Sequence, residues 1–267
     1  GCFIEDTRLR ESLREELRTL PDMERALARL SLGRGSPRDL AAIRAGLAQT
    51  NILRALLQNQ AARDVFRDLL EALRETADIA RLYDMLAQAI IEEPPALVRD
   101  GGFIAPGYHK RLDELKTVRD ESRRLIAGLQ GKYQKDTGID TLKIKHNNIL
   151  GYFIEVPARR ADAMMVKGGE RENPYIHRQT MAGAVRFTTA ELAELERDIS
   201  SAADKALALE LEMFSQLTEE CKACSEDILA RAAAAAALDM ASGLAELAAE
   251  WNYVRPVIDN TLVFSIK

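Results

Sequence analysis

The sequence is poor in aromatic residues, and it has neither a leader nor a long apolar run. Only 5% of its 267 residues are aromatic although 47% are hydrophobic, so aliphatic side chains must build the core. No run approaches the ~18 apolar residues of a membrane span, and no charged-then-apolar segment opens the chain. We therefore expect a soluble intracellular protein, or a segment of one, with no membrane partner.

Cysteine and histidine are equally scarce, at three residues each. An odd cysteine count in a chain of this length argues against a disulfide framework. Cys221 and Cys224 form a single C-x-x-C within a helical pattern, which favours two small helix residues over a zinc or redox site. Isolated histidines offer no catalytic constellation, and no G-x-x-x-x-G-K-S/T phosphate loop is present. The sequence therefore predicts no catalytic, cofactor-binding or metal site, and no enzyme activity in this chain.

Ala, Leu, Glu and Arg are abundant, a composition typical of long helices and coiled coils. Residues 1–107 have the pattern of several packed helices: Asp22 can cap a helix over 23–32, and Ser36-Pro37 pairs an N-cap with a proline at the first helical position. A further helix is expected over 51–73. The arginines of this part alternate with acids, which favours solvated helix faces; a DNA-facing stripe is the alternative. They are Arg25, Arg29, Arg38 and Arg44.

Two longer helical segments follow, over residues 108–135 and 188–237, and neither contains proline. The first has apolar or small residues at steps of three or four: Tyr108, Leu112, Leu115, Val118, Ser122, Leu125, Leu129 and Tyr133. The second has a strict heptad seam: Leu192, Leu195, Ile199, Ala202, Ala206, Leu209 and Met213. Two such seams predict an antiparallel helix pair.

Between these helices, residues 138–189 have a strand-like pattern. Alternation over 142–146 and over 152–156 predicts two strands joined by a turn that ends at Gly151, a residue able to adopt the left-handed conformation. One face is expected to pack inward and the other to carry lysines. The inward set is Leu142, Ile144, Tyr152, Ile154 and Val156, and the lysines are Lys143 and Lys145.

Charge is segregated along the chain, which carries −5 in total. The stretch from Thr141 to Phe187 contains eight basic and four acidic residues, so its formal net charge is +4. Short hydrogen-bonding side chains are interleaved with the cations, a mixture that suits phosphate oxygens, whereas the aromatics are too few for a base-stacking surface. If this stretch binds nucleic acid, the pattern predicts a grip on the backbone of a duplex rather than sequence reading; the alternative, which composition alone favours, is a soluble hairpin whose lysines only discourage edge pairing.

Four stretches, in this order, make the chain recognisable. They are GGFIAPGYHKRLDEL, DTGIDTLKIKHNNILGYFIEVP, YIHRQTMAGAVRFTTAELAELE and KALALE. Together they resemble the MutS family of DNA mismatch-repair proteins over nearly the whole chain. The chain departs from the family pattern at 182–184, where the family often has polar or charged residues, and over 166–174, which is rich in Gly and Glu.

The resemblance implies a mostly α fold: a helical bundle base with two long antiparallel lever helices and a small β-rich clamp inserted at their tip. It implies a helical core over 1–107, an outgoing lever helix over 108–135, the clamp over 136–188, the returning lever helix and core over 189–250, and the start of a connection to an ATPase domain over 251–267. A short strand pattern over 261–266 and the abrupt start at Gly1-Cys2 lead us to interpret the chain as a segment of a longer protein.

The resemblance also implies a function: sequence-independent binding of the double-stranded DNA backbone by the clamp, coupled through the levers to the ATPase domain. The implied contact residues are Lys143, Lys145, His146, Asn147, Asn148, His177, Arg178, Gln179, Thr180 and Arg186. The full-length family uses ATP and Mg²⁺ outside this chain, pairs with a second MutS subunit and works in the bacterial cytoplasm at the nucleoid. The alternative is a coiled-coil scaffold for protein–protein association without DNA binding of its own.

Overall fold

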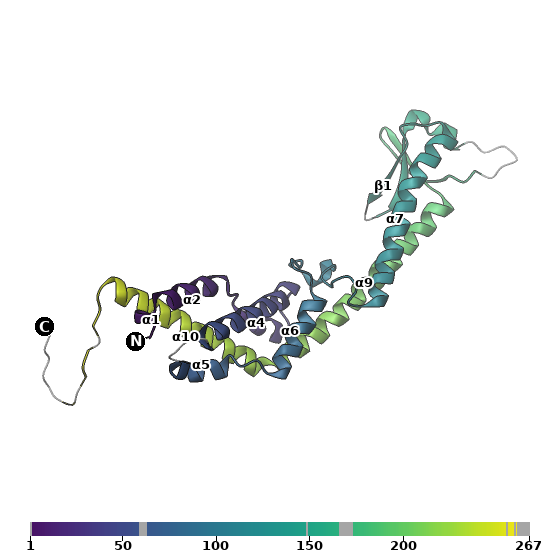
Figure 1. The fold of residues 1–267 in the computed structure, drawn as a ribbon. Coiled ribbons are helices and arrows are strands. Elements are labelled where there is room, and N and C mark those ends of the chain that lie inside the picture. Colours follow the sequence, from purple (N-terminus) through teal and green to yellow (C-terminus); the bar gives the residue numbers. More distant parts are fainter. Residues whose placement is uncertain are drawn as a thin grey trace. The chain divides into compact units, whose positions relative to one another are not determined.

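The structure is a computed structural model that describes residues 2–58, 63–147, 149–165, 173–254, 256–258 and 260. The chain divides into two units (Figure 1). Unit 1 contains Gly1–Ala105 and Phe214–Lys267, and unit 2 contains Pro106–Met213. The fold is mostly helical, with one small antiparallel sheet, as the sequence predicts. The finer division into core, levers and clamp stays a prediction.

Unit 1 has helices as the named elements of its described part, and an isolated antiparallel bridge that joins Ile90 to Ile104. Its elements are α1 (Cys2–Glu5), α2 (Thr7–Thr19), α3 (Met23–Ser31), α4 (Pro37–Gln58), η1 (Arg63–Phe66), α5 (Arg67–Ala72), α6 (Ala77–Ala89), η2 (Val98–Asp100) and α10 (Ser225–Glu250). The predicted Asp22 cap is confirmed, because its carboxylate accepts from Arg25 N at 2.8 Å. Helix α4 begins at Pro37, as predicted, while the Ser36 hydroxyl donates to the Asp39 carboxylate at 2.9 Å. Local capping chemistry therefore sets where these helices begin.

The prediction of a separate helix from Asn51 is wrong, because α4 runs unbroken from Pro37 to Gln58. Gly46 lies in its middle and allows a close approach: a Cβ there would overlap the Met23 side chain of α3. A glycine in a helix costs about 1 kcal/mol relative to alanine. At this position the contact between α3 and α4 offsets that cost.

Helix α10 lies at the centre of unit 1, where α1, α2, α3, α4 and α5 pack against it. It is long and apolar enough to meet a length-and-composition test for a membrane span, which corrects the sequence-based statement that no segment comes near that limit. Its alanines raise the hydropathy, and small side chains also let neighbouring helices approach closely. Leu238 and Ala235 on α10 are buried among side chains of α2, α4 and α5, so in this fold α10 is a core helix.

Unit 2 consists of two long helices and a sheet whose strands lie between these helices in the sequence. Its elements are α7 (Lys110–Thr137), β1 (Lys143–Asn147), β2 (Gly151–Pro157), η3 (Ala158–Arg160), α8 (Asp162–Met165), β3 (Ile176–Met181), β4 (Ala184–Thr188) and α9 (Ala190–Ala223), whose last residues belong to unit 1. Gly138 ends α7 with φ 66°, and Gly151 opens β2 with φ 65°. The predicted left-handed conformation of Gly151 is thereby confirmed.

The buried stripe of α7 differs in phase from the predicted one. Val118 and Leu125 are exposed, whereas Ile126 is buried. The observed stripe has steps of three and four: Leu112, Leu115, Arg119, Ser122, Ile126, Leu129 and Tyr133, with Arg119 half-buried and the others buried. A seam that faces one partner must keep one heptad phase, so a polar residue at 119 is accepted and the apolar Leu125 is left outside.

The seam of α9 is as predicted. Leu192, Ile199, Ala202, Ala206 and Met213 are buried, and Leu195 and Leu209 are half-buried. The two helices also share polar contacts.

Lys116 Nζ lies 3.0 Å from Glu210 Oε1, and the Tyr133 hydroxyl hydrogen-bonds the Thr189 hydroxyl at 2.8 Å. Thr189 also accepts from Leu192 N at 3.1 Å, which caps the start of α9. These contacts join α7 and α9 within unit 2.

The returning helix is not continuous over 188–237, because α9 ends at Ala223 and α10 begins at Ser225. Cys224 at the break has φ −96° and ψ 17°, yet backbone bonds run through it, from Cys224 N to Glu220 O and from Ile228 N to Cys224 O. Cys221 and Cys224 are both buried free thiols. Burial raises the pKa of Cys221 to about 12, which agrees with a packing role. The strand pattern over 261–266 lies outside the described residues.

Candidate nucleic-acid interface

The four strands form one antiparallel sheet in the order β1-β2-β4-β3. Ile144 pairs with Ile154, and Ile154 pairs with Phe187. Paired residues share a face, and this inner face packs with Ile126, Leu129 and Tyr133 of α7 and with Leu192 and Ile199 of α9. Figure 1 shows the strands beside the last turns of α7. The inward-packing set predicted from the sequence is confirmed, with Ile144 and Tyr152 partly buried.

The opposite, outer face is defined by six residues that follow from the same register: Lys143, Lys145, Phe153, Glu155, Gln179 and Arg186. Lys145 lies opposite Phe153, and Lys143 lies opposite Glu155. Glu155 in turn lies opposite Arg186, which lies opposite Gln179. One polar, net positive surface therefore crosses all four strands.

The Glu155 carboxylate is the centre of this face. Its Oε1 accepts from Lys145 Nζ at 2.6 Å, and its Oε2 accepts from Arg186 Nε at 3.1 Å. Arg186 also donates to Gln179 Oε1 at 3.0 Å and stacks 4.4 Å from the centre of the Phe153 ring. The bond from Lys145 and the bond from Arg186 hold the pKa of Glu155 below its ordinary value. The sequence analysis treated Glu155 only as one acid in a count.

The predicted contact residues do not all share a face. Lys143, Lys145, Gln179 and Arg186 lie on the outer face. His146, His177 and Thr180 pair with inner-face residues, and His177 Nε2 lies 2.9 Å from the Thr180 hydroxyl. Arg178 is exposed in a β-bulge. Asn148 lies outside the described residues.

The remaining predicted residue, Asn147, stabilises the β1–β2 turn. Its Oδ1 accepts from Ile149 N at 3.0 Å and from Leu150 N at 2.7 Å. From α9, Glu196 accepts from Tyr152 N at 3.1 Å, and a Cβ at Gly151 would overlap the Glu196 side chain. The turn is therefore fixed from both sides, with Asn147 in a structural role that its sequence position did not reveal.

The predicted contact residues form two clusters, one on β1 (Lys143 to Asn147) and one on β3 (His177 to Thr180). These clusters lie at opposite edges of the sheet, because β1 and β3 are its edge strands. Three strand spacings of about 4.8 Å separate them by roughly 14 Å. Each strand of a duplex presents a phosphate about every 3.4 Å along its axis. The distance between the two edges is therefore larger than this phosphate spacing.

An open groove of about 500 Å³ adjoins the outer face. Lys143, Lys145 and Glu155 lie on its strand side, and Asp140 and Gly183 lie at its rim. Over the described part of 141–187, six basic residues oppose Glu155 and Asp162, which gives +4. The basic residues are Lys143, Lys145, Arg159, Arg160, Arg178 and Arg186.

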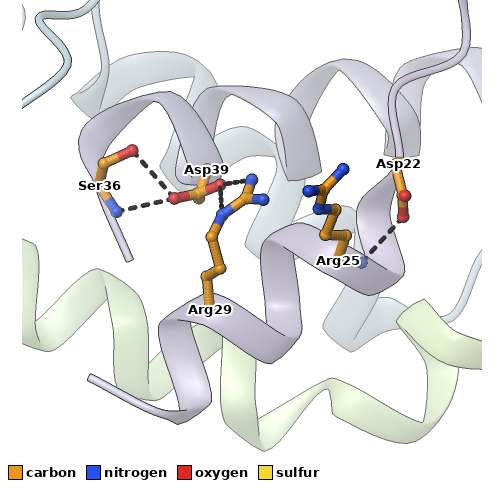
Figure 2. Close-up of polar contacts among 5 residues, drawn as sticks. All are labelled: Asp22, Arg25, Arg29, Ser36 and Asp39. Carbon is orange, nitrogen blue, oxygen red and sulfur yellow. Dashed lines mark hydrogen bonds and ion pairs between the residues drawn. The ribbon is translucent and has the colours of Figure 1, made fainter. Parts of the chain in front are cut away.

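Three arginines of unit 1, namely Arg29, Arg38 and Arg44, bind groups of the chain itself. Figure 2 shows Arg29 directed at Asp39, whose other oxygen accepts from Ser36 N at 2.8 Å. Arg38 donates to Pro94 O at 3.2 Å, and Arg44 donates to Ile90 O at 2.5 Å. The interpretation as solvated faces is confirmed for Arg38, which is exposed, and for Arg29, whose side chain is 43% exposed, whereas Arg44 is half-buried. Their guanidinium groups tie helices to a loop and to each other, which also weakens the alternative of a DNA-facing stripe.

Comparison with known proteins identifies the class. The fold is a helical core joined to a helix pair that carries a small cationic sheet, and a family model described as MutS domain III matches residues 1–245. The DNA mismatch repair protein MutS of Rhodopseudomonas palustris (strain BisB5) is 46% identical over 269 residues, covering 100% of this chain. The chain spans 29% of the length of that relative. This chain belongs to the MutS family of DNA mismatch-repair proteins, and it corresponds to the domain III region.

Proposed function

We propose that unit 2 binds the sugar–phosphate backbone of double-stranded DNA, without sequence preference, through the edge strands β1 and β3. The observation that carries this proposal is the outer face, where Lys143 and Lys145 stand on a rigid sheet with exposed Arg178 at the far edge. Cations on a fixed scaffold with neighbouring amide and hydroxyl groups suit phosphate oxygens. In the terms of the family, this sheet is the clamp.

Within the same proposal, α7 and α9 are the levers. They connect the clamp to the helical core, and in the complete protein they would transmit DNA binding toward an ATPase domain that uses ATP and Mg²⁺. The Lys116–Glu210 pair and the heptad seams support this role, because they join the two helices along their length. A second subunit in the complete dimer and a place in the bacterial cytoplasm belong to the same proposal.

The scaffold alternative has weaker support. A scaffold needs a seam that is available to a partner, whereas the seams of α7 and α9 are buried against each other within unit 2. In contrast, Lys143 and Lys145 of the outer face are exposed and lie beside the groove. These two observations favour a duplex-binding module.

The test is fluorescence anisotropy of this chain with a matched and a mismatched duplex across a salt series. Equal affinity for the two duplexes is expected, with log K falling by about 0.9 per phosphate neutralised for each unit of log salt. The variant with K143E, K145E and R178E should lose at least ~100-fold in affinity at 50 mM salt and show a flatter slope. If the chain does not bind at low salt, and the triple variant of the complete dimer keeps full affinity, the proposal is wrong.

A further inference from the structure

The outer face of the sheet contains a carboxylate that the proposed function does not need. DNA is a polyanion, and a Glu in the middle of a surface meant to bind it reduces the attraction. Yet Glu155 lies on β2, a central strand, with both oxygens engaged by cations of the neighbouring strands. These contacts distinguish Glu155 from an acidic residue placed on the surface without a role.

The geometry around Glu155 resembles that of a bound phosphate. Two oxygens that share one negative charge face Lys145 Nζ at 2.6 Å and Arg186 Nε at 3.1 Å. A phosphodiester also presents two non-bridging oxygens that share one negative charge. The carboxylate thus offers Lys145 the same kind of anionic acceptor that a DNA phosphate would offer.

The two cations differ in how far they are committed to Glu155. The Lys145 side chain is 49% exposed, whereas that of Arg186 is 17% exposed and also contacts Phe153 and Gln179. An exposed lysine can turn from one acceptor to another, because its ammonium group has three donors on a flexible stem. Lys145 is therefore the group that can exchange, and Arg186 is the group that holds Glu155 in place.

We propose that Glu155 is an internal counter-ion that competes with DNA phosphate for Lys145, and thereby keeps the grip of the sheet on the duplex weak and reversible. This inference rests on the proposed function of unit 2. Duplex binding would exchange the Lys145–Glu155 contact for a Lys145–phosphate contact, while Arg186 keeps the carboxylate on the sheet. A module that must hold DNA without sequence preference and then release it gains speed of release from such a competitor.

The experiment compares wild type, E155Q and E155D by anisotropy with a matched duplex between 50 and 300 mM salt. With Lys145 released, E155Q should bind about one more phosphate, so the slope of log K against log salt should steepen by about 0.9. This corresponds to a gain of roughly 5-fold at 150 mM and roughly 15-fold at 50 mM salt. E155D keeps the charge and should remain close to wild type, which a role in packing alone would not explain.

Two further variants isolate the mechanism. E191Q removes the same charge from unit 2 and breaks a Lys132–Glu191 pair of 2.8 Å at the start of α9, and its affinity should stay within about 2-fold of wild type. In a K145M background the gain from E155Q should shrink, because the two residues act through one contact. Circular dichroism melting of each variant confirms that it is folded.

The outcomes separate the two proposals. If wild type binds and folded E155Q binds equally or more weakly, Glu155 is no competitor, and the duplex-binding function stands. If E191Q gains as much as E155Q, the effect is general charge and the inference is overturned. If neither wild type nor E155Q binds at 50 mM salt, the proposed function itself fails and the inference fails with it.

Discussion

The two units use arginine in opposite ways. In unit 1, Arg231 on α10 is fully buried and donates to Thr50 Oγ1 at 2.9 Å, to Asn51 Oδ1 at 2.8 Å and to Arg74 O at 2.8 Å. In unit 2, Arg178 is exposed in a bulge at the sheet edge. The two terminal nitrogens of the first cation donate to groups of the chain itself, and the second cation is open to a partner.

This difference shows that the identity of a residue does not reveal its role. Burial lowers the pKa of Arg231, since desolvation disfavours its charge, and neutral acceptors surround it. An arginine in such a place fixes α4, α5 and α10 against one another. The cations of unit 2 lie over a sheet surface, where long-range attraction for a polyanion is available. Single substitutions in each unit test this difference between the two units.

Replacing Arg231 should have the largest effect. R231A leaves a cavity and three unsatisfied acceptors in unit 1, so we expect a loss of about 3–5 kcal/mol in the free energy of unfolding. Urea titration followed by circular dichroism measures it. The matched control is R74A, whose exposed side chain contributes only a weak 3.5 Å pair with Glu71, and which should change stability by less than about 0.5 kcal/mol. Similar losses in both variants would mean that the Arg231 bonds are not what holds unit 1 together.

The next largest effect on stability is expected in the seam of unit 2. Substitutions there test which residues of α7 form the buried stripe. I126A removes a buried side chain from the cluster beneath the sheet and should cost about 2–4 kcal/mol. L125A changes the neighbouring residue, which is 60% exposed, and should cost less than about 0.5 kcal/mol. Thermal unfolding of the two variants decides between the phases, because the phase predicted from the sequence requires the reverse order.

Local chemistry was predictable from the sequence and non-local pairing was not. Asp22, the Ser36-Pro37 start of α4 and the turn ending at Gly151 each act within a few residues, so their patterns identified them. The two strands 143–147 and 151–157 were found for the same reason. These features needed no information about distant parts of the chain.

The functions of single charged residues required the tertiary structure. Glu155 and Arg186 are 31 residues apart, and their pairing follows from the β2–β4 register, which no local pattern sets. Arg44 reaches a carbonyl 46 residues away. The phase of α7 was missed because apolar identity favoured Leu125, while the geometry of the helix pair selected Ile126. The sequence therefore indicated a segment for the candidate site, but it could not assign the residues of that segment to the faces of the sheet.

A single-cation change compares the two units directly in DNA binding. K143M removes one exposed cation of the outer face and should weaken duplex affinity by roughly 5- to 15-fold between 150 and 50 mM salt, with a slope flatter by about 0.9. R25M removes an exposed arginine of α3 in unit 1, a member of the alternative stripe, and should leave affinity and slope unchanged. Anisotropy against salt measures both variants. A comparable loss in R25M would assign part of the DNA contact to unit 1.

The smallest expected effect is the acid sensitivity that Glu155 gives to unit 2. Its pKa in the folded chain lies below the ordinary value of 4.5, first because of the bond from Lys145 and then because of the bond from Arg186. A lowered folded pKa means that the ion pairs contribute their stability fully above about pH 4.5 and lose it as the pH falls through the folded pKa.

The contribution of these ion pairs to the free energy of unfolding should be below about 1 kcal/mol, since Lys145 is half exposed. E155Q should therefore be slightly less stable than wild type at pH 7, and the difference should shrink as the pH falls below about 4.5 through the folded pKa. Asp120, whose pKa is lowered by Arg119, titrates in both proteins and cancels. Urea midpoints at four pH values measure the difference, and a gap that does not shrink as the pH falls below about 4.5 would show that Glu155 stabilises the sheet by packing rather than by charge.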